Sequence, residues 1–111
     1  MGEYAGTDFY CDVAIPRRRQ LVVTYEDEDV LAFEHTRPYW QTHLVVVPTL
    51  HVGSLLELEP GDLAAKLLLV VQDTARAVVR RAGAAAVTSN LGDYQDSKHL
   101  HFHVHAGRRL E

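Results

Sequence analysis

Histidine alternates with apolar residues along the stretch His99-Leu100-His101-Phe102-His103-Val104-His105. A period of two is the spacing of a β-strand, on which successive side chains point to opposite faces. The pattern therefore predicts a strand that turns its imidazoles to one side and its apolar residues to the core. Imidazoles two positions apart on such a strand lie roughly 6.6 Å from each other. Each imidazole has two ring nitrogens that need partners, so a strand face made of histidine indicates chemistry rather than stability.

The rest of the chain combines short strand patterns with a single long helical pattern. Strands are expected over residues 20–25, 30–33, 43–47, 84–89 and 98–105, with a hairpin turn at 26–29, a short helical turn at 54–58 and a polar loop at 90–97. This order predicts an α+β fold, an antiparallel sheet of about five strands with the helix on one face. The whole chain, 1–111, is expected to form one domain, in which residues 1–19 are an irregular N-terminal segment.

The long helix is expected to begin between Pro60 and Asp62 and to end near Arg81, just before Gly83. Proline suits the first helical turn, an aspartate complements the positive end of the helix dipole, and glycine commonly follows the last turn. Apolar residues recur at helical spacing and predict a buried stripe: Leu63, Leu67, Val70, Val71 and Val78.

Charge and hydropathy narrow the range of partners. The formal net charge of −4 argues against a nucleic-acid partner, and the basic run 17–19 is too short to reverse that balance. The single cysteine, Cys11, cannot form an intramolecular disulfide. The longest apolar run, 67–71, is far shorter than the ~20 residues of a membrane span, and no signal-peptide pattern is visible at the N-terminus. We therefore expect a cytoplasmic protein with no membrane partner.

The histidine face is compatible with two kinds of chemistry. Histidines two positions apart on a strand can share one zinc ion, with His43 or His51 as a further ligand. Alternatively, a neutral imidazole attacks a phosphoryl centre while protonated imidazoles and backbone amides stabilise the oxygens. Histidine suits the second task because its unperturbed pKa, about 6.5, allows both protonation states near neutral pH.

The segment from Gln95 to His105 resembles the signature of the histidine triad (HIT) family, His-φ-His-φ-His-φ-φ with φ apolar, preceded by a glutamine. Gln95, Lys98 and the pair Gly107-Arg108 favour counting the triad from His99, which places His105 at an ordinarily apolar position. Further matches in order and spacing are Tyr25-Glu26-Asp27, Leu31-Ala32-Phe33, Pro38, Thr42-His43, Pro48 to His51, Asn90 and Gly92. The resemblance runs from about Phe9 to Arg108 and implies a HIT-like fold.

The resemblance also implies a catalytic mechanism. His101, at the middle triad position, would attack the α-phosphorus of a nucleotide ester, anhydride or phosphoramidate. The resulting covalent nucleotidyl-histidine would be hydrolysed by water without any metal or cofactor. His103 would hydrogen-bond the phosphate or the leaving group, and His99 and His43 would support the cluster and orient the nucleophile. The ring nitrogen of His101 that faces away from phosphorus is expected to donate to a backbone carbonyl.

Nucleotide-binding residues follow from the same resemblance. Asn90 and the region of Gln95 would contact phosphate or ribose, and Asp96 stands where a serine or threonine often contacts phosphate. Phe33 would line the base pocket, although it is expected to be a core residue as well. His35 replaces the acidic residue that usually binds the ribose hydroxyls, so ribose recognition is weaker or passes to Glu34.

A zinc site is a separate expectation. Some family members bind zinc with a Cys-x-x-Cys near the start and two later histidines, and here the first cysteine is replaced by Asp8. Asp8, Cys11, His51 and His99 would then form a four-coordinate site, since all these residue types bind zinc. The family also implies a homodimer and a purine nucleotide or nucleotide conjugate as partner. Two other functions stay open: a catalytically weak nucleotide-binding protein, and a metal-binding protein that uses the histidine cluster.

Overall fold

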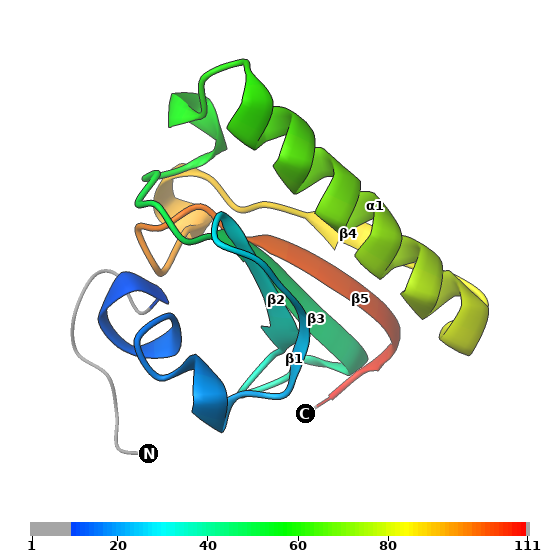
Figure 1. The fold of residues 1–111 in the computed structure, drawn as a ribbon. Coiled ribbons are helices and arrows are strands. Elements are labelled where there is room, and N and C mark those ends of the chain that lie inside the picture. The colour runs from blue at the N-terminus through cyan, green and yellow to red at the C-terminus, as the bar shows by residue number, and fades with distance from the viewer. Residues whose placement is uncertain (1–9, 111) are drawn as a thin grey trace.

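The computed structural model describes residues 10–110, which form a single antiparallel sheet with one long helix across it (Figure 1). Within this range the strand order is β1-β2-β3-β5-β4, and the elements are β1 Val23–Glu26, β2 Val30–Glu34, β3 Trp40–Pro48, α1 Asp62–Ala82, β4 Ala86–Thr88 and β5 Phe102–Arg109. Short helical turns lie at Tyr10–Ala14, Arg18–Gln20, Leu55–Glu57 and Gly92–Tyr94. The predicted α+β fold is therefore confirmed. No described helix has the length and hydropathy that a bilayer crossing requires.

The two faces of the sheet carry different cores. Alternate residues of β2 and β3, such as Ala32 and Val46, pack with Leu100 and Val104 beneath α1. Their neighbours Phe33 and Val45 pack on the opposite face, where the N-terminal turn supplies Tyr10. Figure 1 shows α1 lying along one side of the sheet and the helical turn Tyr10–Ala14 on the other side. The histidines therefore share a face with the second core, away from α1.

The long helix matches its predicted bounds. Gly83 follows it with a φ of 85°, a left-handed conformation that favours glycine, and its N–H donates to Val79 O. The predicted stripe is buried except for Leu63, which is partly buried, and Thr74 fills the space between Val71 and Val78.

Some strand boundaries differ from the expectations. β1 begins at Val23 because residues 18–20 close a 3-10 turn, in which Leu21 N–H donates to Arg18 O. Described residues of the N-terminal segment are also helical at Tyr10–Ala14. β5 begins only at Phe102, since Leu100 N–H donates to Val52 O at 2.6 Å and holds the preceding segment against the loop after β3. His99 and His101 thus precede the strand that was expected to contain them.

Candidate active site

The pairing of β3 with β5 arranges the histidines in rows across the sheet. His43 pairs with His105, and Val45 pairs with His103. Val46 pairs with Phe102, and His101 comes directly before this pair, where β5 begins. On the other side of β3, His35 N–H donates to His43 O at 2.9 Å and extends the His43 row to the end of β2. Moving along the strands, the rows therefore run from His101 through His103 to His43 and His35.

Ring contacts link these rows into one cluster. The ring centroid of His103 lies 4.9 Å from that of His101 and 5.0 Å from that of His43. His35 stacks on His43 at 4.3 Å with an interplanar angle of 21°. His43, His101 and His103 are 4%, 6% and 7% exposed, so these three rings are buried on the sheet. The expectation that strand alternation brings the imidazoles together on one face is confirmed.

His101 is held in a defined tautomer by the backbone. Its Nδ1 lies 2.7 Å from His99 O, and a carbonyl oxygen can only accept a hydrogen bond. Nδ1 therefore carries hydrogen, and Nε2 carries the lone pair when the ring is neutral. The carbonyl of His101 itself accepts from Ser89 Oγ at 2.9 Å, which ties this segment to the end of β4. A carbonyl partner for His101 is what the resemblance had implied.

His43 and His103 adopt the opposite tautomer. Tyr39 N–H donates to His43 Nδ1 at 3.0 Å, so a neutral His43 carries its hydrogen on Nε2. His43 Nε2 lies 2.9 Å from His103 Nδ1 and donates to it. A neutral His103 then carries its hydrogen on Nε2. In the neutral cluster Nε2 therefore carries no hydrogen on His101 and carries hydrogen on His103.

His35 follows the same rule as His43. Arg37 N–H donates to His35 Nδ1 at 3.0 Å, which places the hydrogen of a neutral His35 on Nε2. Two backbone amides of the loop between β2 and β3, those of Arg37 and Tyr39, thereby fix the two stacked imidazoles in the same state.

Burial keeps these imidazoles neutral. It lowers the pKa of His43 to about 3, and the nearby imidazoles of His35 and His103 contribute to this shift. Burial also lowers the pKa of His35 and of His103 to about 4, with His101 as the next cause for both. At neutral pH the three rings are therefore uncharged, and the tautomers set by their partners are the relevant states.

His105 is the last of the alternating histidines of the 99–105 stretch, and an aromatic ring covers it. Trp40 stacks on it at 3.7 Å with an interplanar angle of 15°. His105 Nε2 is buried and has no hydrogen-bond partner among the described residues, and burial lowers the pKa of this ring. Trp40 is the first residue of β3, which begins before the strand expected at 43–47, and its ring covers this end of the cluster.

The residues expected to bind nucleotide lie in different environments. Gln95 is buried, and its Nε2 donates to Gly53 O at 2.7 Å, whereas Asp96 is exposed and Asn90 is half-buried. Phe33 is 1% exposed, because Tyr10 packs over it with a centroid distance of 6.2 Å. Glu34 lies on the α1 side of β2 by strand alternation, so it does not share a face with the histidines.

Tyr10 is the residue of this region that sequence reasoning missed. Its ring lies 4.8 Å from the His101 ring and 5.8 Å from the His99 ring, and it is 5% exposed. The adjacent Cys11 was one sequence signal pointing here, because a helical turn that brings Cys11 to the histidines also brings its neighbour.

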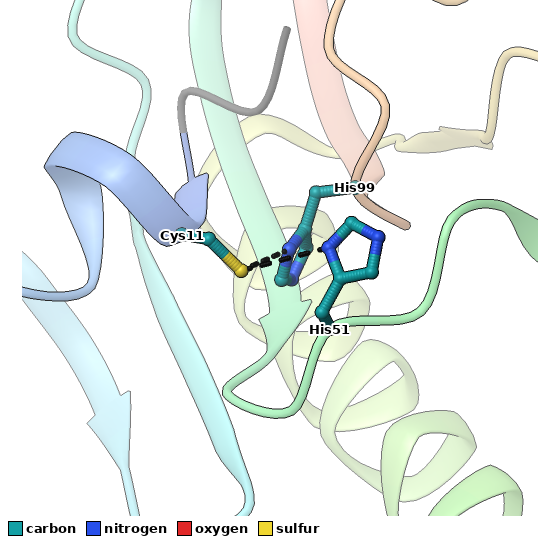
Figure 2. A group of neighbouring side chains, drawn as sticks. All are labelled: Cys11, His51 and His99. Atoms are coloured by element: carbon teal, nitrogen blue, oxygen red, sulfur yellow. Dashed lines mark hydrogen bonds between the residues drawn. The ribbon is translucent and has the colours of Figure 1, made fainter.

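A second cluster lies where the N-terminal turn meets the segment before β5 (Figure 2). Cys11 Sγ is 3.1 Å from His99 Nδ1 and 3.6 Å from His51 Nδ1. His99 Nε2 lies 2.8 Å from Pro48 O and donates to it, so a neutral His99 turns its Nδ1 lone pair toward the thiol. The expected fourth ligand, Asp8, lies outside the described residues.

The two clusters differ in their fitness for a metal ion. Cys11, His51 and His99 bring one sulfur and two ring nitrogens within 4.8 Å of one another, and His35, His43 and His103 do the same with three ring nitrogens. In the second set His35 and His43 have their lone pairs taken by backbone amides. In the first set the backbone carbonyl of Pro48 orients His99 as a ligand, which is the usual outer-shell arrangement around zinc. Only the cysteine-containing set of these two fits a metal.

Comparisons with known proteins agree with this fold. The family model of the HIT domain matches residues 17–110. Protein HitA of Neisseria gonorrhoeae is 30% identical over 83 residues, which cover 72% of this chain and 78% of that protein. A 13.2 kDa HIT-like protein of Azospirillum brasilense is 37% identical over 95 residues, covering 77% of this chain and 74% of the relative.

Solved structures extend the similarity to three dimensions. A HIT family hydrolase from Legionella pneumophila superposes with a TM-score of 0.77 at 25% identity and covers 94% of this chain and 96% of its own. A Zn-bound histidine triad family protein from Mycobacterium smegmatis has a TM-score of 0.77 at 27% identity, with 92% and 76% covered. With the family model matching most of its length, this chain belongs to the HIT domain family.

Proposed function

We propose that the chain is a nucleotide hydrolase or transferase that attacks the α-phosphorus of a nucleotide conjugate with His101. The observation that carries this proposal is the pair of opposite tautomers at neighbouring positions, His101 with Nδ1–H and His103 with Nε2–H. A nucleophile needs a lone pair on the attacking atom, whereas an oxyanion needs a donor. The comparisons support a hydrolase in general, since the similar protein from Legionella pneumophila is a HIT family hydrolase.

In the first step His101 Nε2 forms a bond to phosphorus, and the bond to the leaving group breaks with its electron pair. The leaving nitrogen of a phosphoramidate takes a proton from solvent and departs as a neutral amine. The positive charge that develops on the imidazole is stabilised by the Nδ1–H bond to His99 O. In the second step water attacks phosphorus, the P–N bond breaks, and its electron pair returns to Nε2. The products are a nucleoside monophosphate and the leaving group, and the water proton passes to solvent. A transferase replaces this water by another acceptor.

His103 acts as a hydrogen-bond donor to a phosphate oxygen and not as an acid. Its Nδ1 already accepts from His43, so loss of the Nε2 proton from the neutral ring would leave an imidazolate anion. A fixed N–H group instead stabilises charge on the oxygen without any proton transfer. His43 and the Tyr39 amide behind it are positioning groups, because they hold that N–H group in place.

The remaining contacts of the proposed substrate follow the layout of the face. The phosphate lies over His101 and His103, and the base lies on the β2 side, at Phe33, once the Tyr10 ring tilts away. Half-buried Asn90, which follows β4, is proposed as a phosphate ligand. Gln95 instead stabilises the loop after β3 by donating to Gly53 O. Exposed Asp96 is placed at the mouth of the site. A purine nucleotide or its conjugate fits this arrangement.

Turnover of adenosine 5′-phosphoramidate tests the proposal. The protein should release AMP, and a rapid acid quench should trap one adenylyl group on His101, identified by mass spectrometry. His101→Ala should bind AMP but release none from the substrate. The matched control is His105→Gln, which changes a histidine of the same alternating stretch that lies beneath Trp40, and it should retain turnover. If wild type and His101→Ala bind the nucleotide equally and neither turns it over, the chain is a nucleotide-binding protein and not an enzyme.

We also propose that Cys11, His51 and His99 hold a zinc ion, because their donor atoms converge and His99 is already in the ligating tautomer. The structural relative from Mycobacterium smegmatis is described as Zn-bound. A zinc thiolate requires a reduced cysteine, which agrees with the expected cytoplasmic location. Zinc at this site would supply structural cross-linking of the N-terminal turn to the loop after β3. Elemental analysis should find one zinc per chain, and Cys11→Ser should lose it.

A homodimer is the proposed assembly. α1 exposes apolar side chains on the side away from the sheet, with Leu68 and Leu69 each 59% exposed and Val79 46% exposed. Light scattering should give twice the chain mass of 12.5 kDa, and a mass near 12.5 kDa would contradict the dimer.

A further inference from the structure

The part of the site that would hold the sugar of a nucleotide, its sugar edge, offers a hydrogen-bond donor, on His35, but no side-chain acceptor on that residue. In the proposed complex the phosphate lies over His101 and His103 of the β5 segment, and the base lies on the β2 side. The sugar that joins them must cross β3 above Val45, which pairs with both His103 and Phe33. This inference rests on the proposed function and concerns the specificity of the same site.

Val45 has a neighbouring row of residues on each side along β3, and on one side this row is apolar. The adjoining row there contains Val47 and Leu31, which pair with each other and are both 0% exposed. The row on the other side contains His43 and His35, joined by the bond from His35 N–H to His43 O. Of these two described rows, the one that offers side-chain hydrogen-bonding partners to the sugar hydroxyls is therefore the histidine row.

Within that row His35 is the residue with an available hydrogen-bonding atom. His43 uses Nδ1 for the Tyr39 amide and Nε2 for His103. His105 lies under Trp40 at 3.7 Å and is covered from above. His35 keeps its Nε2–H, which no atom in residues 10–110 accepts, while its Nδ1 is taken by the Arg37 amide.

His35 thus provides one donor and no acceptor. Its ring is fixed by stacking on His43 at 4.3 Å, so it cannot turn its lone pair toward the sugar without losing the Arg37 bond. Glu34, the nearest carboxylate in the sequence, lies on the α1 side of β2 and does not reach this edge. A site selects a vicinal diol by accepting both hydroxyl protons, as the two oxygens of a carboxylate do.

We propose that His35 determines sugar specificity and makes the site indifferent to the 2′-hydroxyl. A single N–H donor is satisfied by the 3′-oxygen, which ribose and 2′-deoxyribose share. Its substrates therefore include 2′-deoxynucleotide conjugates as well as ribonucleotide conjugates. Sites built to pair a substrate hydroxyl strongly reject the analogue without it, and within residues 10–110 this row offers no carboxylate for such rejection.

The test compares adenosine and 2′-deoxyadenosine 5′-phosphoramidates on wild type, His35→Asp and the neighbouring exposed control Thr36→Asp. For wild type and the control, kcat/KM should differ between the two sugars by less than about threefold, within the worth of one neutral hydrogen bond. For His35→Asp the ribose substrate should be preferred by about tenfold or more, because the carboxylate accepts both hydroxyl protons. The ratio between sugars cancels any general effect of the new charge on catalysis.

Dissociation constants of AMP and 2′-deoxy-AMP, measured by calorimetry, report the same preference without turnover. A wild-type preference above about tenfold for ribose, in turnover or in binding, would overturn the inference, since it requires an acceptor that His35 does not provide. An unchanged ratio in folded His35→Asp would also overturn it. Failure of both phosphoramidates to react, with equal binding of both nucleotides, would instead reject the proposed function and leave the role of His35 supported.

Discussion

Two clusters of histidine lie on the same face of this sheet and differ in one chemical property. Around Cys11 the backbone contributes an acceptor, Pro48 O, which takes the Nε2 hydrogen of His99 and leaves a lone pair toward the thiol. Around His43 the backbone contributes donors, the amides of Arg37 and Tyr39, which occupy lone pairs and leave N–H groups in the site. The backbone partner of each ring, more than the ring itself, therefore separates a metal site from an oxyanion site.

His99 connects the two clusters. Its ring belongs to the cysteine cluster, while its carbonyl accepts from His101 Nδ1 and orients the proposed nucleophile. His99 is 0% exposed, and its contacts with Cys11 and with His101 fix its position in both clusters. This shared residue makes the comparison testable, because a change confined to one cluster should leave the other one intact.

The largest expected effect is a loss of turnover with no change in zinc content. His101→Ala should lower kcat by at least about a thousandfold, because a covalent mechanism cannot proceed without its nucleophile. Zinc content should stay at the wild-type value, since this substitution leaves the carbonyl and the ring of His99 in place. Single-turnover kinetics and elemental analysis of the same sample measure both. A loss of zinc together with turnover would show that the clusters are not separable in this way.

A smaller loss is expected when the tautomer of His103 is released. In His43→Ala the ring of His103 loses its Nε2–H donor from His43, so its own hydrogen is shared between both nitrogens. We expect kcat/KM to fall by about ten- to a hundredfold. This is less than the loss on removal of a group that itself contacts the transition state, because His43 acts through His103. A change of less than about twofold, in a variant that melts within a few degrees of wild type, would remove His43 from the mechanism.

Metal affinity provides a matched pair. His51→Ala should weaken zinc binding by about tenfold or more, whereas His35→Ala should leave it unchanged, because His35 has no lone pair to offer. Competition with a chromophoric chelator measures both affinities. The opposite ranking would place the metal at the three-histidine cluster and reverse our assignment of the two sites.

The smallest expected effect concerns stability against acid. His35, His43 and His103 have folded-state pKa values of about 3 to 4, below the value near 6.5 of an unfolded histidine. Between these values the unfolded chain binds more protons, so the free energy of unfolding is highest above about pH 6.5 and falls as the pH decreases toward 4. Urea unfolding at pH 7.5 and 5 should show a lower midpoint at pH 5, and His103→Gln should narrow the difference. Equal narrowing in His51→Ala would contradict this origin.

Much of this architecture could be predicted from the sequence. Alternation around His101 correctly assigned the imidazoles to one face and Leu100 and Val104 to the other, because side-chain direction on extended backbone depends only on position. Pro60 and Gly83 bounded the helix through local conformational preferences. The spacing between Cys11, His51 and His99 became informative only through the resemblance to a family.

The partners of individual ring nitrogens could not be predicted. The start of β5 was placed too early because Leu100 pairs with Val52 outside the sheet, a contact between distant segments. The amides that cap His35 and His43 come from the loop 35–39, whose fold depends on the packed strands on either side. Tyr10 reaches His101 through the position of a whole helical turn. Each of these depends on tertiary structure rather than on local pattern.

The most direct test of the account is a long-range ¹H–¹⁵N correlation of the histidine side chains at pH 8, where the neutral rings reveal which nitrogen carries hydrogen. We predict hydrogen on Nδ1 for His101 and on Nε2 for His35, His43, His99 and His103, as their partners dictate. Hydrogen on Nε2 of His101, or on Nδ1 of His103, would contradict the assignment of nucleophile and donor.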